Sequence, residues 1–182
     1  MRVLFSIMIL FLGSLLAAQS DSTVAPQKSD SDIAVVRVPG FFATGLNTNS
    51  FFLSRHITPK VRPENKQAML FSFFTTSCVP CRKEIPFLSG QIKKYTIEKA
   101  YLINVGEKKD QVQKYLDHYQ YDMKTLLDPY GMVAKKLKVT TTPVMMIISG
   151  DGELLYRHNG FLAPDTIEIA RHLEQWFAED SK

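Results

Sequence analysis

The chain has 182 residues, of which 45% are hydrophobic, and its 22 Lys and Arg against 18 Asp and Glu give a formal net charge of +4. This length and hydrophobic content suffice for one domain with a buried core, and they exclude fibrous, collagen-like and wholly disordered chains. The basic residues are scattered, with no run long enough for a nucleic-acid-binding arm, so no nucleic-acid partner is expected.

The first segment, residues 1–20, has the layout of a secretory signal peptide. A basic residue precedes an apolar run that ends in small residues at Ala17, Ala18 and Ser20. Residues 3–18 are shorter than the ~20 apolar residues that span a bilayer, so cleavage is expected, with an uncleaved membrane anchor as the alternative. The sequence therefore predicts export to the periplasm or cell envelope, and contact with a membrane only if this segment is retained.

Residues 21–33 are polar and have no apolar period, which predicts a flexible linker. Residues 34–182 show no internal repeat and no further break in composition, so one domain is expected there. Near the start of this domain, Phe41-Phe42 and Phe51-Phe52 are candidate strand residues.

The apolar pattern of this domain predicts strands that alternate with helices. A nearly continuous apolar run over residues 67–75 fits a strand buried on both faces, and residues 100–105 fit a second strand. Between them, Ile85, Leu88 and Ile92 recur at helical spacing. These three elements form a β-α-β unit.

Three helices and a hairpin are predicted in the second half. An amphipathic helix begins near Asp110, a short helix covers residues 132–137, and a closing helix begins near Pro164. Strand-like runs at 144–148 and 154–158 flank a Ser-Gly-Asp-Gly turn of the kind that joins antiparallel strands. The predicted fold class is therefore α/β, with a mixed sheet.

Both cysteines, Cys78 and Cys81, lie between the first predicted strand and its helix, and three roles compete for them. A structural zinc site needs four ligands, and the four histidines offer no short ligand spacing. A structural disulfide would close a loop so short that it contributes only ~2 kcal/mol. The third role is a redox-active pair, because side chains three residues apart on a helical turn lie ~5–6 Å apart, near enough for a disulfide to form and open. The spacing favours this redox role, which requires no metal and no organic cofactor.

Position relative to the helix assigns a role to each sulfur. Unpaired N–H groups and the positive dipole end at the helix N-terminus favour a thiolate at Cys78, which we predict to be the nucleophile. Cys81, one turn inside, is predicted to be the less exposed, resolving thiol, which attacks the mixed disulfide formed at Cys78.

Nine residues that begin at the first cysteine resemble the CxPCxxExP segment of TlpA/ResA-like thiol-disulfide oxidoreductases, within the thioredoxin superfamily. They are Cys78-Val79-Pro80-Cys81-Arg82-Lys83-Glu84-Ile85-Pro86. Leu127 to Gly131 and Val139 to Pro143 are similar to later segments of that family. The resemblance implies a three-layer fold, with helices on both faces of a mixed central sheet.

The resemblance also implies a partner-binding site around the cysteine pair. In such proteins the proline at the position of Pro143 follows a cis peptide bond and faces the two cysteines, and a prolyl cis bond is far less costly than any other. Val79, Pro80, Thr142 and Pro143 are the substrate-binding residues that the resemblance implies. Partners would be protein thiols or disulfides of the cell envelope, together with an upstream electron donor or acceptor protein.

Three positions depart from the family pattern. Ser77 replaces the usual aromatic residue before the first cysteine, and Phe74 replaces a tryptophan. Ser72 stands where thioredoxin itself carries a buried acid and cannot act as a carboxylate base. Glu84, which can share a helical face with Cys81, is then the candidate proton acceptor, with a solvated or capping role as the alternative.

These features predict an exported thiol-disulfide oxidoreductase that acts as a reductant. Val79-Pro80 resembles the pair of reducing members, including those that keep the haem-site thiols of cytochrome c reduced. A thiol peroxidase is the alternative enzyme, because peroxidatic sites also place a threonine three residues before the reactive cysteine, as Thr75 stands to Cys78. The alternative from another class is a thioredoxin-fold binding module without turnover.

Overall fold

The structure of the protein is a computed structural model, and it describes residues 35–47, 49–57 and 67–178. The chain divides into two units, Met1–Ile33 and Ala34–Lys182, and every described residue belongs to the second. The predicted signal peptide and linker therefore lie outside the described residues. Within the described ranges, no helix combines the length and the apolar character needed to cross a membrane.

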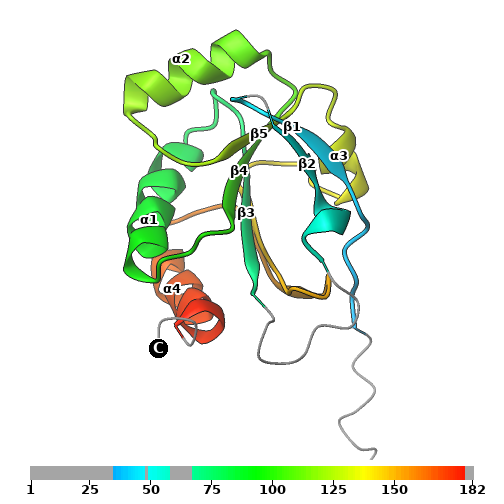
Figure 1. Ribbon diagram of the computed structural model, residues 1–182. Coiled ribbons are helices and arrows are strands. Elements are labelled where there is room, and N and C mark those ends of the chain that lie inside the picture. Colours follow the sequence, from blue (N-terminus) through cyan, green and yellow to red (C-terminus); the bar gives the residue numbers. More distant parts are fainter. Residues whose placement is uncertain (1–34, 48, 58–66, 179–182) are drawn as a thin grey trace, which may run out of the picture. The chain divides into compact units, whose positions relative to one another are not determined.

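Seven strands form one mixed sheet in the order β2-β1-β5-β4-β3-β6-β7 (Figure 1). β3, β4 and β5 run parallel to one another, whereas β6 and β7 continue the sheet as an antiparallel hairpin. The sheet is mixed, as the predicted hairpin requires. The strands are β1 (Phe42–Gly45), β2 (Ser50–Phe52), β3 (Met69–Phe74), β4 (Ala100–Val105), β5 (Thr125–Asp128), β6 (Val144–Ile148) and β7 (Leu154–Asn159).

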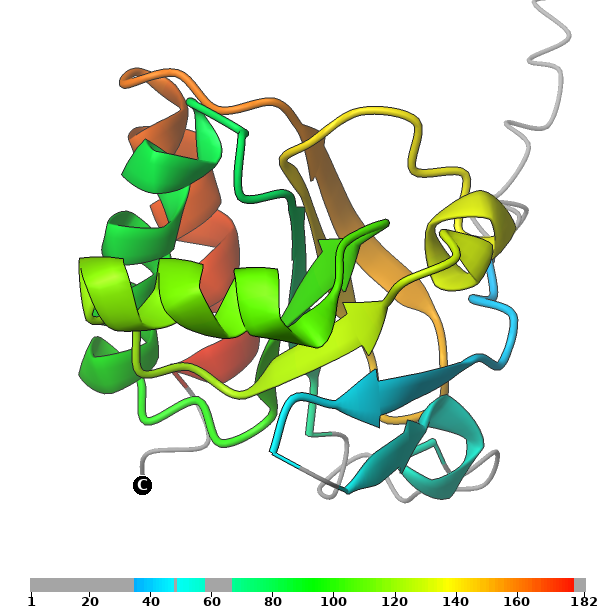
Figure 2. The same ribbon diagram turned by 90° about the horizontal axis from the view of Figure 1, so that it is seen from above.

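Four α-helices cover the two faces of this sheet. They are α1 (Cys81–Lys94), α2 (Lys109–Tyr119), α3 (Met132–Lys136) and α4 (Asp165–Phe177). α1, α2 and α4 lie on one face, and α3 lies on the other (Figures 1 and 2). The predicted α/β class, with a central mixed sheet between helices, is confirmed, and three of the four helices share a face.

The central strand β3 is buried at all six of its positions. Its side chains alternate between faces, so Phe71 and Phe73 pack in the cluster beside α3. Leu70 packs beneath α1 and α4, and Phe74 packs beneath α1 and α2. Both faces of β3 are covered, which is why its sequence is apolar throughout instead of alternating.

Short strands complete the sheet on the side of β5. Phe42 pairs with Phe52 in the hairpin of β1 and β2, which confirms strand structure at both aromatic pairs, although Phe41 itself precedes β1. β1 then pairs with β5, an element whose strand character the apolar pattern does not indicate. β5 has four residues, too few to show a period, and its strand structure comes from pairing with β4 and β1.

Candidate active site

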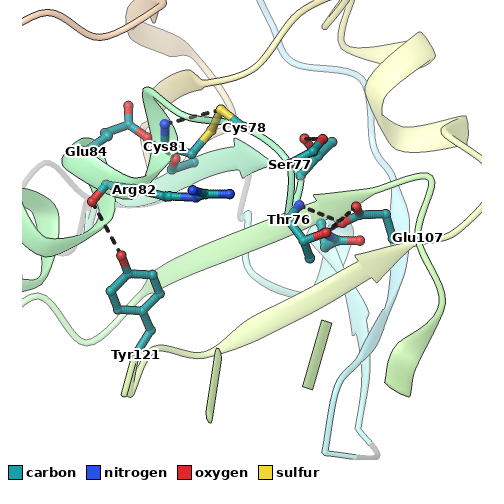
Figure 3. The surroundings of a disulfide bond; sticks show 11 residues. Thr76, Ser77, Cys78, Cys81, Arg82, Glu84, Glu107 and Tyr121 are labelled. Atoms are coloured by element: carbon teal, nitrogen blue, oxygen red, sulfur yellow. Dashed lines mark hydrogen bonds between the residues drawn. A yellow bond between two sulfur atoms is a disulfide. The ribbon is translucent and has the colours of Figure 1, made fainter. Parts of the chain in front are cut away.

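Cys78 and Cys81 are joined by a disulfide at the point where β3 leads into α1 (Figure 3). Cys81 is the first residue of α1, and Cys78 lies in the preceding loop, with 5.3 Å between the two Cα atoms. Cys78 is 8% exposed and Cys81 is 0% exposed. The difference has the expected sign, but Cys78 is not a surface residue, because its side chain packs in the apolar cluster with Phe74 and Ile85.

The start of α1 directs a hydrogen-bond donor at the sulfur of Cys78. The backbone N–H of Cys81 donates to Sγ of Cys78, with an N to S distance of 3.2 Å. This N–H belongs to the first turn, where no helical acceptor exists. Once the disulfide is reduced, the same N–H and the positive end of the helix dipole stabilise a thiolate at Cys78.

We expect the reduced Cys78 thiol to titrate below the ~8.5 of a free thiol for this reason. The measurement is thiolate absorbance against pH in the Cys81→Ser variant, which leaves Cys78 as the only thiol. The matched control is Cys78→Ser, in which Cys81 should titrate higher, because it is fully buried next to an acid. A Cys78 titration at or above that of a free thiol would contradict the helix-terminus argument.

Glu84 lies one turn after Cys81 on α1 and beside it in the site, and its side chain is fully buried (Figure 3). Ser72 on β3 donates its hydroxyl proton to Oε2 of Glu84 at 2.6 Å, whereas Oε1 has no hydrogen-bond partner among the described residues. Burial raises the pKa of Glu84 to about 7, although the hydrogen bond from Ser72 acts in the opposite direction. The alternative of a solvated Glu84 is therefore wrong, because helix packing places the carboxyl inside the domain.

Ser72 and Glu84 form a buried hydrogen-bonded pair between β3 and α1. Ser72 lies on the side of β3 that faces α1, the same side as Leu70 and Phe74. Its hydroxyl is the polar group that the buried carboxyl needs. The sequence contains one signal for this pairing, since Ser72 interrupts an otherwise apolar strand and a buried hydroxyl requires a partner.

The peptide bond between Thr142 and Pro143 is cis, the conformation that the family resemblance implies. Pro143 precedes Val144, which pairs with Phe73 of β3. The proline therefore lies at the end of the sheet where β3 leads into residues 75–80, which we call the cysteine loop. Val79 and Pro80 of that loop are exposed, Thr142 is half-buried and Pro143 is buried. The four predicted substrate-binding residues therefore come from two loops at one edge of the sheet.

Glu107 belongs to no motif in the sequence, yet it binds the cysteine loop directly (Figure 3). Its carboxylate accepts hydrogen bonds from the backbone N–H of Thr76 at 2.8 Å and from the Thr76 hydroxyl at 2.6 Å. It also accepts from Asn104 Nδ2 at 2.5 Å and from Gln111 Nε2 at 2.9 Å. The only sequence-level indication is topological, because parallel neighbours such as β3 and β4 end at the same edge of the sheet.

Tyr121 supports the first turn of α1 from outside the helix. Pro86 cannot donate to the carbonyl of Arg82, and α1 nevertheless continues through Pro86 as one helix. The hydroxyl of Tyr121 approaches the Arg82 oxygen at 3.4 Å, in the position of a hydrogen-bond donor, and the Arg82 guanidinium lies 5.7 Å from the ring centroid of Tyr119. Tyr121 thus contacts the carbonyl that the proline leaves without a helical donor.

A disulfide at the N-terminus of the helix that follows the central strand, with a cis-proline at the same sheet edge, defines a thioredoxin-like domain. The chain belongs to the AhpC/TSA family, whose sequence profile matches residues 39–157.

Curated relatives carry names that describe disulfide chemistry. The chain is 26% identical over 91 residues to thiol-disulfide oxidoreductase ResA of Bacillus subtilis, which covers 49% of this chain and 51% of the relative. It is 28% identical over 111 residues to ResA of Geobacillus kaustophilus, covering 59% of this chain and 62% of the relative. Sporulation thiol-disulfide oxidoreductase A of Bacillus subtilis is 24% identical over 125 residues, or 64% of this chain and 70% of the relative. The chain thus spans between half and two thirds of the first two relatives.

Solved structures show the same fold. A thiol:disulfide interchange protein of the thioredoxin family from Chlorobium tepidum superposes with a TM-score of 0.63 at 17% identity, covering 81% of this chain and 99% of that chain. StoA from Bacillus subtilis superposes with a TM-score of 0.57 at 17% identity, covering 76% of this chain and 96% of that chain. At these identities the likeness concerns the fold alone.

Proposed function

We propose that the protein is a thiol-disulfide oxidoreductase that exchanges the Cys78–Cys81 disulfide or dithiol with protein thiols. The observation that carries the proposal is the disulfide at the start of α1, with the N–H of Cys81 directed at Sγ of Cys78. The relatives named thiol-disulfide oxidoreductases support the same chemistry. Protein thiol pairs are the proposed substrate class, because Val79 and Pro80, which separate the two cysteines, are exposed and can contact a partner chain.

In the reducing direction, exchange proceeds through two attacks on sulfur. The Cys78 thiolate attacks the partner's disulfide, which forms a mixed disulfide and releases one partner thiolate. Cys81 then loses its proton and attacks Sγ of Cys78, which releases the second partner thiolate and leaves Cys78 and Cys81 joined. Two electrons pass to the partner, both of its sulfurs are protonated, and an upstream dithiol must reduce the pair again.

Glu84 is the proposed proton acceptor for Cys81 in the second attack. Its pKa of about 7 means that both protonation states are populated near neutral pH, as an acid–base group requires. Glu84 lies one turn after Cys81 on α1, and both side chains are fully buried. Burial keeps water from competing for the proton.

We further propose that the protein acts outside the cytoplasm, as a reductant in the periplasm or cell envelope. Residues 1–20 support this as a signal peptide or, if uncleaved, a membrane anchor, with 21–33 as a linker to the domain at 34–182. The Val79-Pro80 pair supports the reducing direction and makes the haem-site thiols of cytochrome c candidate substrates. A physiological reductant needs an upstream electron donor protein in the same compartment.

The proposal predicts that the full chain, once reduced, reduces a disulfide-bonded test protein with turnover when a dithiol is supplied. Its reduction potential, measured by equilibration with glutathione, should lie closer to the roughly −270 mV of thioredoxin than to the roughly −120 mV of DsbA. A pair that does not equilibrate with glutathione would favour a binding module. Consumption of hydrogen peroxide faster than disulfide exchange would favour the thiol peroxidase, whose threonine would be Thr75.

A further inference from the structure

Four hydrogen-bond donors from three parts of the chain converge on the carboxylate of Glu107. Two donors come from Thr76 in the cysteine loop, one from Asn104 in β4 and one from Gln111 in α2. The Gln111 amide also donates to the Thr76 hydroxyl at 2.8 Å, which closes the cluster. Hydrogen bonds to a carboxylate are shorter and stronger than those between neutral groups, so this contact fixes the loop firmly.

The contact is placed at the stem of the cysteine loop. Thr76 lies two residues before Cys78, and its backbone N–H points to Glu107 instead of continuing the ladder of β3. The N–H of Cys78 donates to the carbonyl of Thr75, so the backbone between the stem and the nucleophile forms one hydrogen-bonded turn. A fixed Thr76 therefore constrains where Sγ of Cys78 lies.

We propose that Glu107 is a positioning residue for disulfide exchange, and this rests on the proposed function. When the disulfide opens, the sulfur of Cys78 is no longer held by Cys81 through a covalent bond. Glu107 then keeps the stem of the loop in place, so that Sγ of Cys78 stays beside the N–H of Cys81 and the thiolate stays stabilised. Without the hydrogen bonds to Glu107, the cysteine loop moves and Cys78 leaves the helix N-terminus. Its thiol then becomes less acidic and less reactive.

Two substitutions at Glu107 can separate the effect of its negative charge from the effect of its hydrogen bonds. In Glu107→Gln, the amide oxygen can face Thr76 N and Asn104 Nδ2, which are the donors to Oε2. The new amide NH₂ then faces the Thr76 hydroxyl, which can accept, and Gln111, whose amide can turn to present its oxygen. This variant removes the charge and can keep all four contacts, whereas Glu107→Ala removes the contacts as well.

The experiment compares these variants by the rate at which Cys78 reacts with iodoacetamide as a function of pH, and by the rate of disulfide exchange. We expect Glu107→Ala to lower the Cys78 reaction rate near neutral pH by about 10-fold or more and to move its pH profile upward. Glu107→Gln should stay within about twofold of wild type, and Gln111→Ala, which removes one donor from an exposed helix position, should shift the profile in the same direction but less. Ser149→Ala is the matched control, because it also removes a side-chain acceptor of a backbone N–H, that of Glu153 at 2.9 Å. This contact lies in the turn between β6 and β7 and not in the cysteine loop.

Three results would overturn the positioning role. Glu107→Ala could match Ser149→Ala across the pH range, or Glu107→Gln could fall as far as Glu107→Ala, which would show that retaining the contacts does not retain the reactivity of Cys78. If Glu107→Ala does not fold, an unchanged profile in Gln111→Ala would count equally against it. The alkylation rate needs no partner protein, so it still reports on Glu107 if wild type proves unable to exchange disulfides and the proposed function fails.

Discussion

Replacement of Cys78 by serine is expected to abolish disulfide exchange, whereas replacement of Cys81 by serine is expected to stop the reaction at the mixed disulfide on Cys78. Cys78→Ser removes the attacking sulfur, so the rate with a disulfide-bonded test protein should fall to the uncatalysed level, a loss on the order of 10³-fold or more. Cys81→Ser keeps the attacking sulfur but lacks the thiol that resolves the mixed disulfide. It should accumulate partner proteins joined to Cys78, visible as bands on a non-reducing gel that disappear with dithiothreitol.

The control for both cysteine variants is folding stability against the reduced wild-type protein. Reduced wild type and both variants all lack the disulfide and the ~2 kcal/mol that it contributes by closing its short loop, so the three should unfold at similar denaturant concentrations. Full exchange activity in Cys78→Ser, or adducts that form through Cys81 in that variant, would show that Cys78 is not the nucleophile. An absence of adducts in Cys81→Ser, with no turnover by wild type, would support the binding module.

Replacement of Glu84 by glutamine is expected to change how folding stability depends on pH. The carboxyl has a pKa of about 7 in the folded protein against its usual value of 4.5. Below the lower value, Glu84 is protonated in both states and the shift has no effect on stability. As pH rises towards 7, the unfolded chain ionises more readily than the folded protein, so wild type loses stability by about 3 kcal/mol in all.

The Glu84→Gln variant has no such ionisation, so its stability relative to wild type should rise by that amount between pH 4.5 and pH 8. Urea unfolding of the oxidised proteins across this range measures the difference, and Glu98→Gln, at an exposed position, is the matched control. Stability curves of wild type and Glu84→Gln that run parallel would contradict a buried, weakly acidic Glu84. If Glu84 also accepts the proton of Cys81, the resolving step should slow on the order of 10²-fold in this variant, while attack by Cys78 is spared.

Much of the fold could be predicted from local patterns in the sequence. The apolar runs of β3 and β4, the turn between β6 and β7, and the helical periods of α1, α2 and α4 each lie within a few consecutive residues. β5 could not be predicted this way, since its strand structure depends on neighbours that are distant in sequence. Periodicity reports on one element at a time, whereas pairing depends on the whole sheet.

The residues of the candidate site also divide into those that adjacent sequence predicts and those whose place depends on packing. The cysteine pair and its order relative to the helix follow from adjacent residues, and they were predictable. The burial of Glu84 depends on how α1 packs against β3, so spacing along the helix allowed either a buried or a solvated carboxyl. Glu107 is 29 residues from Cys78, and only the parallel pairing of β3 with β4 brings its loop to Thr76.

The place of β3 in the strand order bears on how the domain opens locally. β3 has two strands beyond it on one side and four on the other, so its amides should exchange with solvent deuterium only in the largest openings of the domain. β2 and β7 are the edge strands, and their amides should exchange through smaller fluctuations. The cysteine loop is thus attached to the strand that we expect to exchange most slowly, and opening of β2 or β7 would leave the segment that carries Cys78 in its native arrangement.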